Sequence, residues 1–336
     1  MILVRAPLRI SFVGGGTDLP GFYRQYPGRV ISTTIDKYVY VAINSTPLID
    51  KLTVKYQQTE SVTHPRELKH PSIKAALMDL GITEQGIEIG SFADLPARTG
   101  LGSSSSFAVA LLKGLHAYLG KKMSKEEAAC AACRLEIELL KEPIGKQDQY
   151  AAAHGGFNRI QFNADETVSV DPIFLDYEKR LMLGNHVLVF FTGITRSASR
   201  VLRTQAPKIS DRIETYKKMS DSVFDFEEML LRGDMERLAL MLHEGWEYKK
   251  SLSPHISNSL IDNLYKTGIE SGVWGGKVLG AGGGGCVLFI APPKKHPFIR
   301  RALTQAAKKN QLGDFREIPV SFVQSGVDIL LNSHFR

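Results

Sequence analysis

A stretch rich in glycine and serine, residues 95–107, carries the clearest chemical signal in the sequence. Its glycines permit positive φ angles and a close approach of the backbone to a ligand. Four serines follow directly before an apolar run, residues 107–119, that predicts a buried helix. The first N–H groups of a helix lack intrahelical partners and carry the positive end of its dipole, so we predict a nucleotide triphosphate site here. The predicted phosphate-binding residues are Gly100, Leu101, Gly102, Ser103, Ser104, Ser105 and Ser106.

A helix N-cap preceded by turn glycines is the simpler alternative for this loop. Four serines in a row before so apolar a helix exceed what a cap requires, which favours the phosphate site. The loop is not a Walker A motif, because no Lys-Ser or Lys-Thr follows a G-x-x-x-x-G.

A second glycine run, residues 280–285, has the spacing G-x-G-x-x-G. The apolar segment after it, residues 286–290, predicts a strand, whereas the dinucleotide-binding fingerprint must open a helix. We therefore interpret the run as a tight turn packed against a ligand or another stretch of backbone.

Two carboxylates stand where phosphoryl transfer could use them. Glu136 lies late in the helix predicted for residues 124–141, where the helix dipole disfavours a negative charge and a bound metal would offset that cost. A solvated surface position for Glu136, or neighbouring Glu138 as the metal ligand, are equally good alternatives. Asp148 lies in the first turn of a short helix, where carboxylates ordinarily cap. Beside a transferred phosphoryl group, such an Asp can also accept a proton from a substrate hydroxyl.

The N-terminal segment, residues 9–18, is a third candidate site. A strand that runs into three glycines can turn sharply, and Asp18 then presents a carboxylate that could bind sugar hydroxyls. The alternative is a glycine turn with an Asx cap.

The elements that must position these residues follow from the hydrophobic pattern. Residues 30–35 and 38–43 predict a hairpin that turns at Asp36-Lys37, and Ser124 to Glu127 form a capping box. Residues 165–176 are the predicted linker between two α+β domains. Predicted strands are 9–13, 30–35, 38–43, 86–89, 157–162, 187–192, 276–279, 286–290 and 319–323. Predicted helices are 73–80, 107–119, 124–141, 147–153, 197–231, 235–251, 256–268 and 297–308.

Length and composition agree with this organisation. The chain has 336 residues, which fit two packed domains, and no apolar run reaches the roughly 20 residues that span a bilayer. The patterned N-terminus does not resemble a signal peptide, so we expect a cytoplasmic protein without a membrane partner. Cys130 and Cys133 form a C-x-x-C in an Ala-rich helical stretch, where core-facing thiols are a better interpretation than zinc or redox chemistry.

The net charge of +7 comes from scattered basic pairs, such as Lys249-Lys250, which we interpret as solvated surface. A nucleic-acid binder would concentrate that charge in one patch, so no nucleic-acid partner is expected. A mild positive field suits anionic small substrates. The sequence gives no oligomeric state, and a homodimer stays open.

In this order, the segments resemble the GHMP kinase superfamily, which includes galactokinase, homoserine kinase, mevalonate kinase and phosphomevalonate kinase. Its first motif resembles residues 6–20, its phosphate loop residues 95–107, and its third motif residues 277–286. With residues 145–149 the resemblance spans most of the chain. It implies an N-terminal domain (1–170) like the second domain of ribosomal protein S5 and a ferredoxin-like C-terminal domain (180–336). The site would lie between them.

Within the superfamily, residues 7–23, 34–40 and 192–196 are most similar to the D-glycero-D-manno-heptose 7-phosphate kinases. That resemblance implies ATP-dependent phosphorylation of the anomeric hydroxyl, giving a 1,7-bisphosphate for nucleotide-activated heptose and surface glycans. Where galactokinases have Glu-His-Thr-Asp, this chain has Gly-Gly-Thr-Asp (15–18), which leaves room for a larger or more anionic substrate.

The resemblance also implies roles for individual residues. Asp148 would be the catalytic aspartate, with Arg9 steadying it and the phosphoryl group, while Ser104 and Glu136 would hold Mg²⁺. A substrate phosphate needs a basic residue; Arg196 is the first expectation and Lys37 the second, with an ordinary surface arginine as an equal alternative. The residues expected to contact the substrate are Gly15, Gly16, Thr17, Asp18, Lys37, Arg196, Gly282 and Gly283.

Two other functions fit the same sequence. One is another kinase of the superfamily that acts on a free sugar such as fucose or on an isoprenoid alcohol. The other is a non-catalytic nucleotide- or sugar-binding regulator, which is disfavoured because Ser104, Glu136 and Asp148 are all present.

Overall fold

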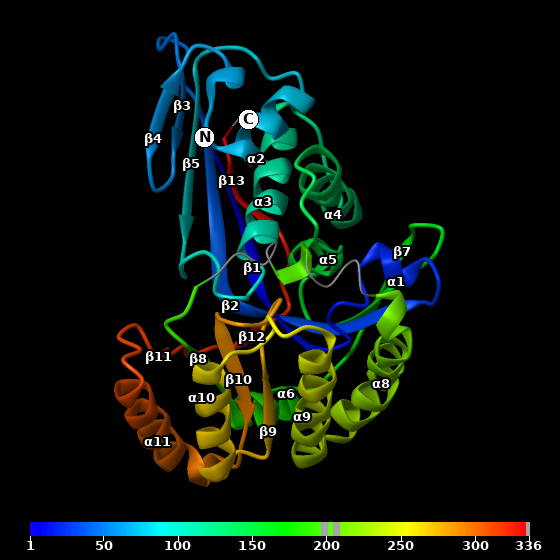
Figure 1. Ribbon diagram of the computed structural model, residues 1–336. Helices are drawn as coiled ribbons and strands as arrows, with labels where there is room; N and C mark the ends of the chain where they lie inside the picture. Colours follow the sequence, from blue (N-terminus) through cyan, green and yellow to red (C-terminus); the bar gives the residue numbers. More distant parts are fainter. Residues whose placement is uncertain (196–200, 204–208, 334–336) are drawn as a thin grey trace.

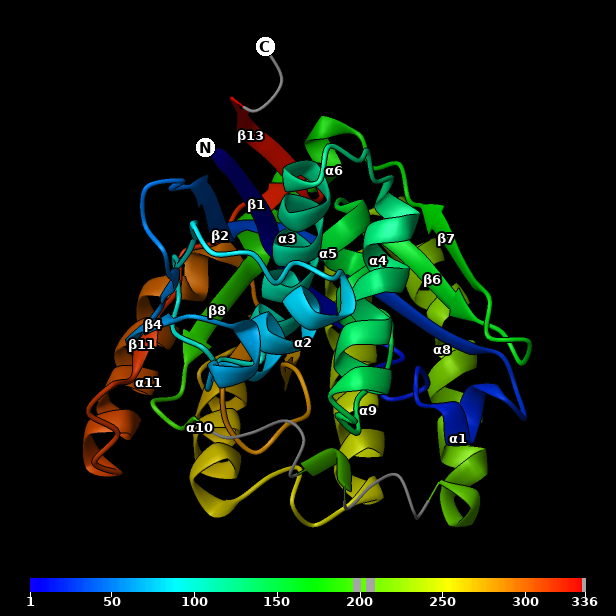
Figure 2. The same ribbon diagram turned by 90° about the horizontal axis from the view of Figure 1, so that it is seen from above.

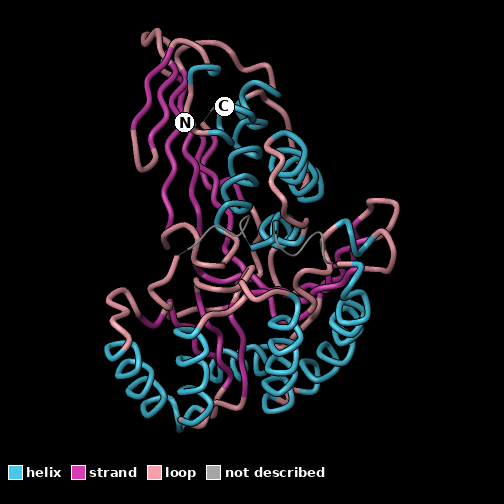
Figure 3. Tube along the Cα trace, in the orientation of Figure 1, coloured by secondary structure: helices cyan, strands magenta, loops and turns pink. Residues whose placement is uncertain are grey.

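The computed structural model of the protein describes residues 1–195, 201–203 and 209–333, which form two lobes (Figure 1). The upper lobe in that view contains a large sheet with helices against one face, and the lower lobe contains a small sheet with long helices. Both lobes contain strands and helices, as the tube in Figure 3 shows. The two-domain α+β fold expected from the sequence is confirmed.

The large sheet has nine strands within the described chain, in the order β13-β1-β2-β5-β3-β4; β6 and β12 also pair with β2, and β7 pairs with β6. Its strands are β1 (Ile2–Val13), β2 (Gly28–Ser45), β3 (Leu52–Lys55), β4 (Thr59–Val62), β5 (Ile87–Ala93), β6 (Asn158–Phe162), β7 (Val168–Pro172), β12 (Phe322–Val323) and β13 (Asp328–Asn332). The predicted linker, residues 165–176, is therefore wrong in part, because it contains β7.

The predicted hairpin at Asp36-Lys37 is also wrong, because β2 runs straight through it. Both halves of β2 pair with the same strand, β1, on either side of a bulge that places Pro7 opposite Tyr38 and Arg9 opposite Thr34. Asp36 in the bulge bonds instead to Ser321. Its N–H donates to the Ser321 carbonyl, and its carboxylate accepts from the Ser321 N–H, each at 2.9 Å. The polar pair thus marks an interruption of one ladder rather than a chain reversal.

Helices cover one face of the large sheet (Figures 1 and 2). They are α2 (Pro71–Asp79), α3 (Ser103–Tyr118), α4 (Lys125–Cys133) and α5 (Gln147–His154). A one-turn helix, α1 (Pro20–Tyr23), follows the three glycines at residues 14–16. α3 contacts both β1 and β2 and is buried nearly all round, as its composition predicts.

The helix predicted for residues 124–141 changes its winding part of the way along. It starts with the expected capping box at Ser124, stays α-helical to Cys133, and continues as a π-helical segment, Arg134–Leu139. π-Helical segments are rare in proteins overall, and those that do occur often lie at functional sites. Here the segment buries Leu135 and Glu136.

The lower lobe has a four-stranded antiparallel sheet in the order β11-β8-β10-β9. Its strands are β8 (Val187–Phe191), β9 (Gly275–Val278), β10 (Cys286–Ile290) and β11 (Arg316–Glu317). The helices of this half are α6 (Tyr177–His186), α8 (Ile213–Arg232), α9 (Met235–Leu252), α10 (Ser259–Glu270) and α11 (His296–Lys309). Part of the helix predicted for 197–231 lies outside the described residues.

One hydrophobic core joins the two lobes. It contains Ile10 and Phe12 from β1, Leu288 from β10 and Phe226 from α8. Because interiors pack at the density of organic crystals, such a shared core holds the facing walls of the two lobes in a defined relation.

The last described strands return to the upper lobe, since β12 pairs with β2 and β13 with β1. The sequence did not predict β13, and the division at residues 170–180 stays a prediction. No helix within the described residues is both long and apolar enough to cross a membrane. Cys133 is buried as expected, whereas Cys130 is exposed, so the expectation that it faces the core is wrong. Cys286 is also buried.

Candidate active site

Most of the predicted site residues line one cavity of about 1010 Å³ at the junction of the lobes. Its walls come from β1, the loop before α3, the π-helical segment and α5 on the N-terminal side. The end of α9 and the loop after β9 supply the other side. The predicted residues on the cavity wall are Arg9, Gly16, Asp18, Gly100, Gly102, Ser103, Ser104, Ser105, Glu136, Asp148 and Gly282.

The N-terminus of α3 opens on this cavity behind a left-handed glycine. Gly102 is the N-cap residue, with φ +79°, and none of the described side chains caps the first turn. A Cβ at this position would lie 3.2 Å from Cγ of Arg9, so glycine lets the loop lie against that side chain. The geometry fits the expected anion site, because uncapped N–H groups and the helix dipole point the same way.

Two residues of the predicted phosphate loop lie behind the cavity wall. Leu101 is fully buried in the core between the lobes, and its carbonyl accepts a hydrogen bond from the Arg9 N–H at 3.0 Å. The Ser106 hydroxyl donates to the Pro7 carbonyl at 2.8 Å. These residues fix the loop to β1, and their side chains are not among those that line the cavity.

The second glycine run packs against the first. Gly280 has φ +71°, and a Cβ there would lie 2.8 Å from Cα of Gly100. At Gly285 a Cβ would lie 2.5 Å from the Thr99 carbonyl oxygen, to which the Cys286 N–H donates at 2.8 Å. The tight turn predicted from the sequence is confirmed, and its partner is another stretch of backbone.

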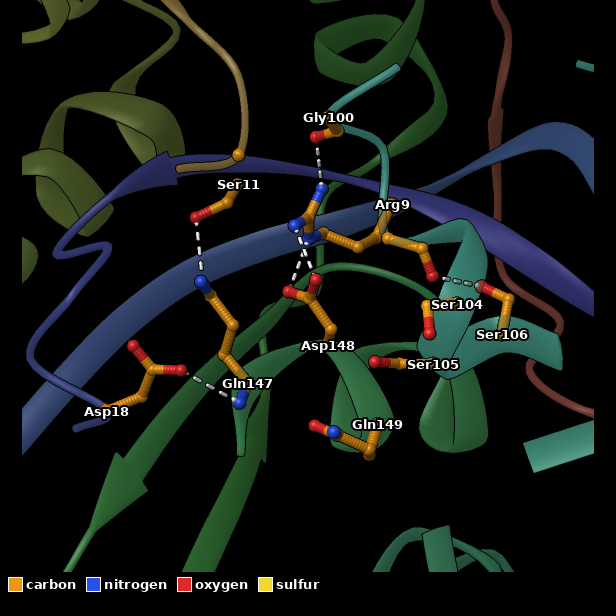
Figure 4. A network of polar contacts seen from close by, with 12 residues as sticks. Arg9, Ser11, Asp18, Gly100, Ser104, Ser105, Ser106, Gln147, Asp148 and Gln149 are labelled. Carbon is orange, nitrogen blue, oxygen red and sulfur yellow. Dashed lines mark hydrogen bonds and ion pairs between the residues drawn. The ribbon is translucent and has the colours of Figure 1, made fainter. Parts of the chain in front are cut away.

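Arg9 and Asp148 form a two-point ion pair at the centre of the site (Figure 4). Nε and Nη2 of Arg9 donate to Oδ1 and Oδ2 of Asp148 at 2.8 and 2.7 Å, and Nη1 donates to the Gly100 carbonyl at 2.8 Å. The Arg9 side chain is 3% exposed and the Asp148 side chain 25%, so a ligand reaches the carboxylate more readily than the guanidinium. Bidentate pairing fixes the orientation of that carboxylate.

Glu136 reaches the serines at the start of α3. Its Oε1 accepts a hydrogen bond from Ser104 at 2.6 Å, and its Oε2 accepts from Ser105 and from Gln149, each at 2.7 Å. Burial raises the pKa of Glu136, and the three hydrogen bonds oppose that shift. Of the two alternatives, the structure favours Glu136, because Glu138 is exposed and does not line the cavity.

The carboxylate of Asp18 is held by hydrogen bonds next to the glycine loop of residues 14–16. Oδ1 accepts the Gly16 N–H at 3.1 Å and Oδ2 accepts the Gln147 N–H at 3.2 Å. Burial, and then repulsion from Asp148, raise the pKa of Asp18. Gly145 closes over it, since a Cβ there would lie 2.0 Å from Oδ2 of Asp18.

Several expected substrate contacts are not on the cavity wall. Thr17 is fully buried, and its hydroxyl bonds to both the carbonyl and the N–H of Arg29. The Lys37 ammonium lies 3.0 Å from the Asp36 carboxylate, outside the cavity lining. Gly15 and Gly283 are likewise absent from the lining, and Arg196 lies outside the described residues.

Sequence reasoning missed side chains that complete the site. Gln147 accepts a hydrogen bond from Ser11 at 3.0 Å beside Asp18 (Figure 4). Gln149 donates a hydrogen bond to Glu136. Lys249 was interpreted as solvated surface but is only 6% exposed and lines the cavity. Its position in the last turn of an amphipathic helix, one residue from another lysine, gave no signal of burial.

Aromatic side chains gather at another part of the cavity wall. The rings of Tyr56 and His70 lie 4.8 Å apart and edge-on, and those of His70 and Phe107 lie 5.3 Å apart. Phe92, 65% exposed, lines the same cavity. Such a surface suits a flat heterocycle.

No group of three or more His, Cys, Asp or Glu side chains suited to a metal ion occurs in the described part of the chain. Ser104 and Glu136 fit a different arrangement, in which Mg²⁺ takes one carboxylate, phosphate oxygens and water.

Two regions of the chain match family models, the "GHMP kinases N terminal domain" over residues 70–156 and "GHMP kinases C terminal" over residues 226–309. A D-glycero-alpha-D-manno-heptose 7-phosphate kinase from Campylobacter jejuni is 29% identical over 97% of this chain and 98% of its own length. A bifunctional fucokinase/GDP-fucose pyrophosphorylase from Arabidopsis thaliana is 27% identical over 91% of this chain and 31% of its own length. The crystal structure of a D-glycero-D-manno-heptose 1-phosphate kinase from Bacteroides thetaiotaomicron covers 99% of each chain with a TM-score of 0.81 and 26% identity.

Proposed function

The chain belongs to the GHMP kinases and is an ATP-dependent sugar kinase, and we propose that its acceptor is D-glycero-D-manno-heptose 7-phosphate. The γ-phosphoryl group of ATP would pass to the anomeric hydroxyl, giving the 1,7-bisphosphate and ADP. The observation that carries the proposal is the Arg9–Asp148 ion pair, held within one cavity beside the N-terminus of α3.

In this proposal ATP binds along the wall formed by α3 and the neighbouring aromatic surface. The first N–H groups of α3 bind phosphate oxygens, with help from the hydroxyls of Ser103 and Ser104. The base stacks among Tyr56, His70 and Phe92, which line the same cavity.

Ser104 and Glu136 would hold Mg²⁺ between them and the phosphates. The Ser104 hydroxyl already lies 2.6 Å from Oε1 of Glu136, and the carboxylate is buried at a cost that a cation would offset. When bound, Mg²⁺ neutralises charge that develops on the phosphate oxygens. Ser105 and Gln149 orient the carboxylate through its other oxygen.

Asp148 would orient the anomeric hydroxyl for in-line attack and take its proton. The new bond joins that oxygen to the γ-phosphorus, the bond to the β–γ bridging oxygen breaks, and ADP leaves. Arg9 holds both oxygens of Asp148, which fixes the orientation of the carboxylate toward the acceptor. Asp18, 4% exposed on the same wall, would bind sugar hydroxyls.

The choice of acceptor rests on relatives and on the shape of the first glycine loop. The relative from Campylobacter jejuni, a heptose 7-phosphate kinase, matches nearly the whole chain. Gly16, which lines the cavity beside Asp18, has only a hydrogen atom as its side chain, so the wall there leaves space for a seven-carbon sugar.

The direct test is ADP release by the purified protein with ATP and Mg²⁺. The acceptors would be D-glycero-D-manno-heptose 7-phosphate, the unphosphorylated heptose, fucose, galactose and mevalonate. We expect turnover on the heptose phosphate, with a product whose ³¹P spectrum contains one anomeric and one primary phosphate. Efficient turnover on another acceptor alone would refute the assignment of the substrate.

A fucose 1-kinase is the second candidate, because the fucokinase from Arabidopsis thaliana aligns with most of this chain. The same assay separates the two, since fucose lacks the phosphate that distinguishes the first acceptor. Turnover on fucose with no gain from a phosphorylated acceptor would favour this candidate.

A further inference from the structure

Three arginine or lysine residues of the described chain line the cavity, namely Arg9, Arg98 and Lys249. Nε and Nη2 of Arg9 both donate hydrogen bonds to Asp148. Arg98 lies on the loop before α3 and is exposed, beside the expected phosphates of the nucleotide. Lys249 alone comes from the lower lobe, from the last turn of α9.

Lys249 lies against the glycine loop of residues 14–16. Its ammonium donates to the Gly280 carbonyl, and a Cβ at Gly15 would lie 3.9 Å from its nitrogen. The same Cβ would lie 4.0 Å from the Gln147 side chain and 3.6 Å from the Ser11 hydroxyl. Lys249 therefore reaches the part of the cavity that holds Asp18 rather than the aromatic surface.

This part of the cavity presents carboxylates to an acceptor. Burial raises the pKa of Asp18, and the charge of nearby Asp148 raises it further. An acceptor that itself carries a phosphate would be repelled by both, unless a cation on the same wall met the phosphate.

A second buried lysine lies behind Lys249. Lys277 of β9 is 6% exposed, and its ammonium donates to the carbonyls of Ser11 and Phe12 at 3.0 and 2.7 Å. Burial lowers the pKa of Lys277, and the charges of Lys249 and Arg9 lower it further. Three basic groups thus lie near one another, and an arriving anion would relieve their mutual repulsion.

We propose that Lys249 determines specificity for an anionic acceptor by binding the phosphate of the sugar phosphate. The inference deepens the proposed function and rests on it. Of the two residues expected from the sequence for this role, Lys37 is outside the cavity lining, and Arg196 lies outside the described residues. The ammonium is a compact charge with three donors, which can keep its bond to Gly280 while it meets a phosphate oxygen.

The test is the kinetics of Lys249→Met and Lys249→Arg with heptose 7-phosphate and with the unphosphorylated heptose as acceptors. Lys250→Met is the matched control, because Lys250 is the neighbouring lysine and bonds to Glu247 at 2.8 Å on the surface. For Lys249→Met we expect KM for the sugar phosphate to rise by about 10- to 100-fold, the loss of one charge-assisted hydrogen bond. KM for ATP and turnover on the unphosphorylated sugar should stay within about twofold, and Lys249→Arg should recover part of the loss.

Each alternative outcome is distinct. A rise in KM for ATP, or an equal loss with both sugars, would overturn the inference and assign Lys249 to the nucleotide or to the fold. A melting temperature equal to that of Lys250→Met excludes a defect in folding as the cause of the loss. If the wild-type protein shows no preference for phosphorylated sugars, the proposed function fails first, whatever the variants do.

Discussion

The two ends of the cavity are built in different ways. At the proposed nucleotide end the groups on the wall are backbone N–H groups and serine hydroxyls from one short segment, residues 100–105. At the proposed acceptor end they are charged side chains, Arg9, Asp18, Asp148 and Lys249, from three separate parts of the chain. The first end depends on helix geometry, and the second depends on how the lobes pack.

This difference has a chemical reason. Every nucleoside triphosphate presents the same phosphate chain, so a helix N-terminus and a glycine turn can bind any of them. Acceptors differ in shape and charge, and discrimination among them requires particular side chains in particular places. We therefore expect changes at the acceptor end to affect turnover and acceptor KM, and changes at the nucleotide end to affect Mg²⁺ and ATP.

The largest effect is expected at Asp148. Asp148→Asn keeps one acceptor oxygen for Arg9 but cannot take a proton, so kcat should fall by about 10²–10⁴ while ATP affinity is retained. The measurements are steady-state kinetics and ATP binding by calorimetry. Asp171→Asn, which weakens the exposed pair with Arg159 (3.0 Å), is the control and should be near normal. Unchanged turnover in Asp148→Asn would remove Asp148 from the mechanism.

The next effect should appear at the nucleotide end, in Glu136→Gln. Removing this charge should raise the Mg²⁺ concentration needed for half-maximal rate by about 10- to 100-fold. Glu138→Gln is the matched control, since Glu138 is two residues away and exposed. Equal Mg²⁺ dependence in the two variants would contradict the assignment of Glu136 as a metal ligand.

A smaller effect is expected where the two glycine runs touch. Gly100 has φ +82°, and a Cβ there would lie 2.6 Å from the Leu279 carbonyl oxygen, so Gly100→Ala should lower the free energy of unfolding by more than about 1 kcal/mol. KM for ATP should rise as well, because the loop before α3 must shift. Gly184→Ala in α6, where a Cβ meets open space, is the control and should be neutral or slightly stabilising in urea unfolding. If the two variants unfold alike, the close approach of the two loops is not required for stability.

The smallest effect concerns pH. Burial raises the pKa of Glu136 in the folded protein above its ordinary value of about 4.3. Between the unfolded and folded pKa values the folded chain binds more protons, so the free energy of unfolding falls as pH rises through this window. Urea unfolding without nucleotide should show this fall in the wild type and a smaller one in Glu136→Gln. The raised pKa of Asp18 contributes to both proteins and cancels in their difference. Parallel profiles would mean that the Glu136 carboxyl titrates normally.

The predictions that succeeded from the sequence were local ones. The buried α3, the capping box at Ser124 and the turn at residues 280–285 depend on neighbours within a few positions. The predictions that failed required knowledge of a distant partner. The hairpin turn predicted at Asp36-Lys37 is instead a bulge within one long strand, because β1 pairs with both halves of β2. The unpredicted strand β13 forms because it pairs with the edge of β1.

The sequence by itself determined that the chain has a helix N-terminus suited to phosphates and two glycine turns, and its resemblance to the GHMP kinases implied which carboxylates would act there. Only the tertiary structure decided which charged groups share the cavity. It placed Glu136 rather than Glu138 on the cavity wall through a π-helical turn, and it buried Lys249 while leaving Lys250 on the surface. The contact between Arg9 and Asp148, by contrast, was already implied by the family resemblance. The physical reason is that backbone conformation is governed by local sterics and hydrogen bonding, whereas the burial and partners of a charge depend on packing between lobes that are far apart in the chain.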